Sequence, residues 1–334
     1  MISISNSNII GGLPANLSGG APSNPDFVIE VDTTQAGSAS DTIILPLESG
    51  GTYSGTIDWG DSSTSALSYA NRQHTYAAGG TYTITISGTT FEGWRFAFAG
   101  DRLKITDVSN WGFFTITGDR TFDGCFNLEV TATDAPIITT TSFYSIFRSC
   151  DALTTPDFSN WDTSSVANMQ EAFANCDLFN GNVNGWVHSG VTSVYKMFIN
   201  AIAFNQDLDT WDTSAVINMY RTFTNAVNMN GDIRSWNTSS ATNMGEMLRG
   251  TSIDQDLSSW DINQVTNFSG FGIGITLSTA NYDALLIAWD AQGAMSYSGT
   301  VNFGNSQYTS GGAAEAARTS LISKWGGITD GGAA

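Results

Sequence analysis

The stretch Phe204–Phe223, FNQDLDTWDTSAVINMYRTF, returns in similar form as DLSSWDINQVTNF at Asp256–Phe268. Tryptophans recur at steps of 25 and finally 24 residues, at Trp161, Trp186, Trp211, Trp236 and Trp260. A second column keeps the same register, at Phe122, Phe147, Phe173, Phe198, Phe223 and Leu248. Because one such segment cannot bury its apolar side alone, the two columns predict a solenoid of about six stacked rungs.

Each rung divides at its tryptophan. The alternating residues before it, as in NQDLDTW, favour a short strand. The Asp-Thr-Ser that follows is typical of a helix start, and Val, Met and Phe then recur at steps of three and four, which favours a short helix or 3₁₀ turn. Cys125, Cys150 and Cys176 fall three residues after the Phe column, where later rungs carry Ala or Thr. We expect free, buried thiols there, although a disulfide between adjacent rungs is geometrically conceivable.

This repeat resembles the BspA-type leucine-rich repeat of bacterial surface proteins over about residues 98–275. The segment Ile57–Gly88 resembles the polycystic-kidney-disease-type β-sandwich through Asp58-Trp59-Gly60-Asp61, His74-Thr75-Tyr76 and Gly80-Thr81-Tyr82. Such domains act as spacers or adhesive modules, so the resemblance implies that the ring of His74 packs and hydrogen-bonds within the sandwich corner.

The repeat breaks off near the C-terminus. Helical patterns cover Ser278–Gly293 and Gly311–Gly332, and SYSGTVNFG between them indicates a strand. We therefore expect a mixed β and α/β fold, with an N-terminal β-sandwich, a leucine-rich-repeat solenoid and a C-terminal α/β cap. The expected divisions are an attachment arm (1–25), the sandwich (26–90), the solenoid (91–275) and the cap (276–334).

Composition excludes several classes of function. Lys plus Arg number 12 against 31 Asp plus Glu, a net charge of −19, so we expect no nucleic-acid partner. No apolar run is long enough for a membrane span, and the first residues lack the pattern of a secretory leader. The two histidines are far apart in sequence, and no nucleophile or phosphate-loop motif occurs in a fitting context. We expect no enzyme and assign no catalytic residue.

The candidate ligand-binding surface is the polar face of the expected sheet. It comprises the residues four before tryptophan, two of the residues six before it and one of those two before it: Asp157, Asn182, Asp207, Asp232 and Asp256; Asn205 and Asn230; and Asp209. A carboxylate repeated in every rung is not the unique pair that a hydrolase needs. It can accept backbone N–H bonds at a turn, bind a glycan, or hold divalent cations between rungs. Cofactors are expected to be none, with calcium possible and metal ligands undecided.

Three functions compete. The first is a secreted bacterial cell-surface adhesin, and the second is a bacteriophage virion protein, such as a fibre or head-decoration protein. The third is a carbohydrate-active enzyme, which lacks a catalytic set. We favour the second, located on the virion surface or otherwise extracellular. Its expected partners are a virion or cell-surface protein held through the N-terminal arm and a host surface protein or glycan, and an oligomer is possible.

Overall fold

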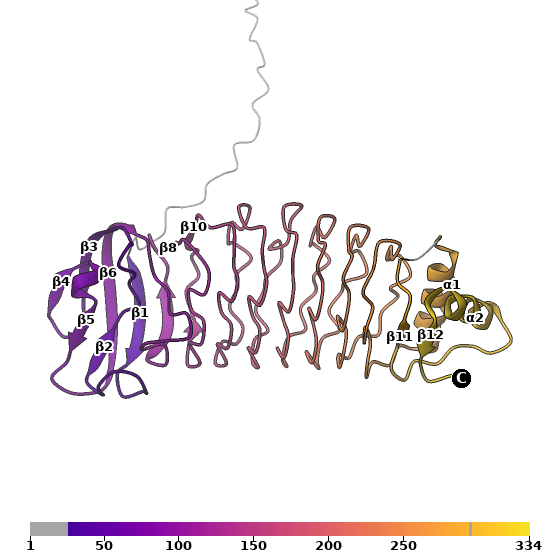
Figure 1. The fold of residues 1–334 in the computed structure, drawn as a ribbon. Helices are drawn as coiled ribbons and strands as arrows, with labels where there is room; N and C mark the ends of the chain where they lie inside the picture. The colour runs from indigo at the N-terminus through magenta and orange to yellow at the C-terminus, as the bar shows by residue number, and fades with distance from the viewer. Residues whose placement is uncertain (1–25, 294–295) are drawn as a thin grey trace, which may run out of the picture.

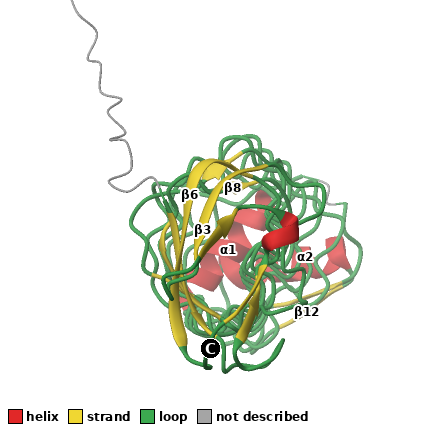
Figure 2. Cartoon of the chain, turned by 90° about the vertical axis from the view of Figure 1, so that its left-hand side faces the viewer, coloured by secondary structure: helices red, strands yellow, loops and turns green. Residues whose placement is uncertain are grey.

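The computed structural model describes residues 26–293 and 296–334, and the expected attachment arm (1–25) lies outside them. The chain is elongated, with a β-sheet region at one end, a long series of stacked turns, and two helices at the other end (Figure 1). Viewed along the stack, the successive turns overlie one another behind strands β3, β6 and β8 (Figure 2).

The main sheet has six strands in the order β4-β3-β6-β1-β7-β9. Their bounds are β1 Phe27–Asp32, β3 Tyr53–Asp58, β4 Thr64–Ala66, β6 Thr81–Phe91, β7 Ile105–Asn110 and β9 Glu129–Val130. A separate pair joins β2 (Thr42–Ile44) to β5 (Gln73–Thr75), and Tyr69–Asn71 form the short 3₁₀ helix η1. Strand β1 buries alternate residues, as expected for a strand with one face on the core.

The β-sandwich expected over residues 26–90 is corrected, because strands β7 and β9, from the expected solenoid (91–275), complete its sheet. Strand β1 pairs antiparallel with both β6 and β7, and β7 pairs parallel with β9. The core is continuous as well, since Phe27 stacks on Phe114 with ring centroids 4.5 Å apart. The corner around His74 is as expected: its ring stacks on Trp59 at 4.8 Å, and its Nε2 lies 2.8 Å from Asp61 Oδ2.

The expected leucine-rich-repeat solenoid is also wrong, because the repeats lack its strand and helix. Strands β8 (Thr115–Ile116) and β10 (Ile137–Ile138) form one parallel pair, and residues 139–278 then contain neither a strand nor a helix. We call residues 139–277 the repeat region. Its neighbouring turns meet at isolated parallel bridges, such as Asn218 with Asn243. The protein is mostly β with several small sheets, and the described residues hold two α-helices, both near the C-terminus.

Left-handed backbone explains why no helix forms after each tryptophan. Arg221 and Asn225 have φ values of 57° and 60°, which a right-handed helix excludes. Alternate N–H groups then point to the next turn instead of along a helix. Phe223 N donates to Met247 O at 3.0 Å, and Asn225 N to Arg249 O at 2.8 Å.

The Phe column predicted from the sequence stacks from Phe122 to Phe223, and the Trp column stacks in two runs, Trp161–Trp186 and Trp211–Trp260. Ring centroids of Trp161 and Trp186 are 5.5 Å apart, and those of Trp236 and Trp260 are 6.2 Å apart. Consecutive rings of the Phe column are parallel at 5.6 or 5.7 Å from Phe122 to Phe223. The three cysteines are buried and free, as expected, and burial raises the pKa of each thiol.

The C-terminal elements are α1 (Thr279–Ala291), β11 (Thr300–Asn302), α2 (Ala313–Trp325) and β12 (Gly327–Thr329). Both helices and the strand predicted there are present, and β11 pairs parallel with β12. Helix α2 ends at Gly326, whose φ of 105° favours glycine. Neither helix, nor any other in the described ranges, is long and apolar enough to cross a membrane.

Candidate functional site

Most candidate residues four before tryptophan form a hydrogen bond within their own turn. The side-chain Oδ1 of Asp157, Asn182, Asp232 and Asp256 each accepts the backbone N–H two residues later, at 2.9 to 3.0 Å. Asp207 differs, because its Oδ1 accepts the N–H of Asp232 in the next turn, at 2.8 Å. Short polar side chains commonly satisfy turns in this way.

The residues six before tryptophan connect one turn to the next. Asn205 Oδ1 accepts the N–H of Asn230 at 2.7 Å, and Asn230 Oδ1 accepts that of Asp254 at 2.9 Å. The series ends on the C-terminal elements, where Asp254 Oδ1 accepts from Ser278 N at 2.7 Å and Asn281 Nδ2 at 2.8 Å. One oxygen of each side chain is therefore committed to holding the stack together.

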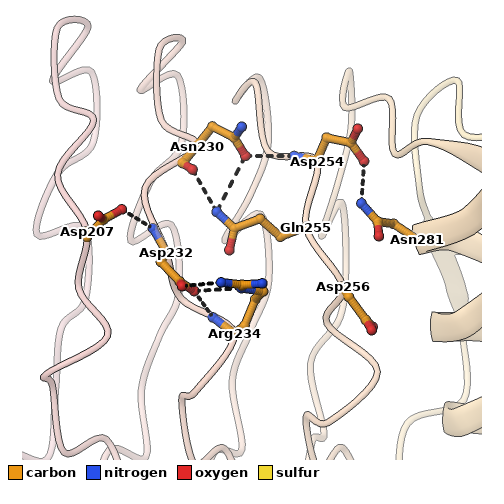
Figure 3. A pocket seen from close by; sticks show the side chains of 8 residues that line it. All are labelled: Asp207, Asn230, Asp232, Arg234, Asp254, Gln255, Asp256 and Asn281. Atoms are coloured by element: carbon orange, nitrogen blue, oxygen red, sulfur yellow. Dashed lines mark hydrogen bonds and ion pairs between the residues drawn. The ribbon is translucent and has the colours of Figure 1, made fainter.

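These two columns meet in a hollow of about 410 Å³, which we call the acidic hollow (Figure 3). Its lining residues are Asp207, Asn230, Asp232, Arg234, Asp254, Gln255, Asp256 and Asn281. Oδ2 of Asp207 and Asp256 accepts no hydrogen bond from the residues that the structure describes. The hollow therefore presents unused carboxylate oxygens, which are acceptors for hydroxyl or amino groups.

Arg234 supplies the positive charge of the acidic hollow. Its Nε and Nη2 donate to the two carboxylate oxygens of Asp232, at 3.0 and 2.6 Å. This two-point bond lowers the pKa of Asp232. At Asp254 burial opposes ionisation, but the bonds from Ser278 and Asn281 lower the pKa overall. Both carboxyls are thus held in the ionised form.

A second hollow of about 460 Å³ continues the same face. Asp209 lines it with Ser235, Ser258 and Ser259, and it shares Asp232, Arg234 and Asp256 with the acidic hollow. Arg234 and its partner Asp232 therefore line both hollows. Together they extend the polar surface across neighbouring turns.

The structure gathers only part of the predicted set. Asp207, Asp232, Asp256 and Asn230 line the acidic hollow, and Asp209 lines its neighbour. Asp157, Asn182 and Asn205 lie on earlier turns of the same columns and line neither hollow. The sequence places Arg234 on the same outward face, two residues before tryptophan like Asp209, but it did not point to Gln255 or Asn281. For Gln255 a signal existed, because Gln206 holds the same place in an earlier repeat: its Nε2 donates to Asn180 O, as Gln255 Nε2 donates to Asn230 O.

The histidines and acids do not assemble a metal centre. His188 is tied to backbone groups, with Nε2 3.0 Å from Thr163 O and Nδ1 accepting from Gly190 N at 3.0 Å. Within residues 26–293 and 296–334, no group of three or more His, Cys, Asp or Glu side chains is arranged to hold a metal ion.

Comparison with known proteins gives one family. Residues 141–252 and 207–302 match the family described as "Mycoplasma protein of unknown function, DUF285", which is associated with BspA-like surface repeat proteins. The match thus covers the repeat region and reaches into the C-terminal elements. No curated protein and no solved structure matches the chain.

Proposed function

We propose that the chain is a non-enzymatic, surface-displayed binding protein that holds a hydroxyl-rich ligand, such as a glycan, on its acidic face. The observation that carries this is the acidic hollow. It combines unused oxygens of Asp207 and Asp256 with the guanidinium of Arg234 on one long side of the stack. Sugar hydroxyls both donate and accept, so alternating carboxylates and a guanidinium suit them.

The lowered pKa values of Asp232 and Asp254 argue against a role for these two carboxyls as the acid of a glycoside hydrolase. Glycoside hydrolysis needs one carboxyl that stays protonated near neutral pH beside one that is ionised. Asp157, Asp232 and Asp254 all have lowered pKa values. The face therefore favours binding over acid–base chemistry.

For the setting, we propose a bacteriophage virion, with the chain as a fibre or head-decoration protein anchored through its N-terminal arm. A bacterial cell-surface adhesin is the alternative, and it draws support from the DUF285 match. Mass spectrometry of purified virions and of cell-surface fractions separates the two. Recovery from cell envelopes without any phage particle would overturn the virion setting and leave the binding role in place.

The binding role is tested with the full chain on a glycan array. Arg234→Gln and Asp232→Asn should each weaken a positive signal about tenfold, the loss of roughly one charged hydrogen bond. Asp162→Asn is the matched control, because Asp162 accepts the Ser164 N–H at 3.1 Å in the same type of turn outside the hollow. Equal binding by all three variants would contradict the placement of the glycan site in the acidic hollow. Release of sugar by the wild type would contradict the proposal that the protein is not an enzyme.

A further inference from the structure

A third hollow lies in the N-terminal region, between three segments that backbone hydrogen bonds hold together. Leu45 N donates to Arg72 O at 2.9 Å, and Arg95 N donates to Pro46 O at 3.0 Å. Leu47 also forms an antiparallel bridge with Trp94. The walls of the hollow are therefore fixed by the fold and do not depend on side-chain packing alone.

This hollow, which we call the arginine hollow, has a volume of about 220 Å³. Its apolar part comes from Leu45, Leu47 and Phe96, all of which are buried, and from Pro46. Tyr69, which is 39% exposed, lines it with the charged residues Glu48, Arg72 and Arg95. Apolar and charged residues thus line the hollow in comparable measure.

The two guanidiniums at this hollow are poorly neutralised. Arg72 donates from Nη1 to Tyr69 O at 3.0 Å and lies 3.8 Å over the Tyr69 ring, but no carboxylate of the described residues comes within ion-pair distance of it. Arg95 has only Glu48, at 3.9 Å, with both side chains more than 40% exposed. By contrast, Arg120, Arg148, Arg221 and Arg318 each hold a carboxylate oxygen within 2.8 Å.

The remaining acid at the arginine hollow is already occupied. Asp101 is buried, and its Oδ1 accepts from Ser38 N at 2.7 Å. Its Oδ2 accepts from Ser38 Oγ at 2.7 Å and Ile44 N at 2.6 Å. The hollow therefore carries two arginines and two acids, and of the two arginines Arg72 has no carboxylate partner among the described residues while Arg95 has only the distant Glu48.

We propose that the arginine hollow binds one acidic sugar residue, with its carboxylate between Arg72 and Arg95 and its ring against the apolar interior. Paired guanidinium–carboxylate bonds are strong and directional. The volume is below the roughly 300–1,000 Å³ of sites for drug-sized ligands, which suits a single pyranose. An extended peptide would need free backbone groups to pair with, and Leu45 N, Arg95 N and Pro46 O are already bonded.

The test uses the full chain and three small probes in calorimetric or ligand-observed NMR titrations. Glucuronate is the probe, glucose is its neutral counterpart, and acetate carries the charge without the ring. We expect glucuronate to bind at least about tenfold more tightly than either of the others. Arg72→Gln and Arg95→Gln should each weaken glucuronate about tenfold or more, whereas Arg249→Gln, at an exposed ion pair with Glu246, should leave it unchanged.

Each alternative result is decisive. If glucose binds as tightly as glucuronate, the arginines do not recognise the carboxylate. If acetate binds as tightly as glucuronate, the site does not recognise the sugar ring. Absence of glucuronate binding to the wild type would overturn the site itself. Arg72→Lys, which keeps the charge, should bind with intermediate affinity and guards against a Gln variant that fails to fold. The variants Arg234→Gln and Asp232→Asn should not affect glucuronate, so failure here is separate from failure of the acidic face.

Discussion

The indole Nε1 of Trp289 donates to the backbone oxygen of Leu257 at 3.2 Å, although Trp289 belongs to helix α1 and not to a repeat. The same bond joins Trp260 to Ile233 one repeat earlier, at 3.3 Å, and Trp236 to Leu208 two repeats earlier, at 3.0 Å. Helix α1 thus places a tryptophan where the next repeat would have placed one. The stacked core ends on a helix without losing its hydrogen-bond pattern.

We predict that Trp289→Phe lowers the free energy of unfolding by about 1 kcal/mol more than Trp161→Phe does. Both changes remove similar apolar volume, but the Nε1 of Trp161 is buried with no partner in the described structure. Urea unfolding followed by far-ultraviolet circular dichroism measures the difference. Equal losses for the two variants would show that the indole bonds contribute nothing to stability.

A second prediction distinguishes the left-handed turns from the helix that the sequence favoured. Ser149 is buried and has a φ of 57°, so Ser149→Gly should raise the free energy of unfolding by up to about 1 kcal/mol. In a helix the same change costs roughly 0.5 kcal/mol, because serine is itself a weaker helix former than alanine. Ser323→Gly, in helix α2, is the matched control and should be destabilising by that amount. A stability loss at both positions would contradict the turn conformation at Ser149.

The spacing of tryptophan and phenylalanine was sufficient to predict which side chains are buried in the core, because burial of repeated side chains depends on register alone. It was not sufficient for the local conformation. Val216, Met219 and Phe223 have helical spacing, yet the backbone at Arg221 is left-handed, and arginine has no preference for that region. A signal was present two residues after the Phe column, where Asn175, Asn200, Asn225 and Gly250 are residue types that tolerate positive φ.

The candidate site was also predictable only in part. Repeat positions place Asp207, Asp232 and Asp256 on one face, and they do share one hollow. Asn281 completes that hollow from helix α1, and its position depends on how the helix packs on the last turn. The arginine hollow could not be predicted, because it brings together residues 44–48, 69–72 and 94–101 through non-repetitive contacts.

A third prediction concerns the ion pair that secures the C-terminal residues. Asp330 accepts from Arg318 Nε at 2.7 Å and from the Tyr282 hydroxyl at 2.8 Å, and its side chain is 2% exposed. Asp330→Asn should lower the free energy of unfolding by about 3 kcal/mol, because the arginine loses its buried partner. The control is Lys324→Gln at the more exposed pair with Asp290, where we expect a loss of less than about 1 kcal/mol. Comparable losses for the two variants in urea would contradict this ranking.

The last prediction concerns acid stability at the corner around His74. The Ser63 hydroxyl, followed by His74, lowers the pKa of Asp61 from 3.8 to about 2. A carboxyl with a lowered pKa stabilises the fold above its unfolded value and loses that contribution as pH falls through the folded value. The melting temperature of the wild type should therefore exceed that of Asp61→Asn above pH 4, and the difference should shrink between pH 4 and pH 2. A difference that stays constant across this range would mean that the Asp61 carboxylate does not stabilise the corner through its charge.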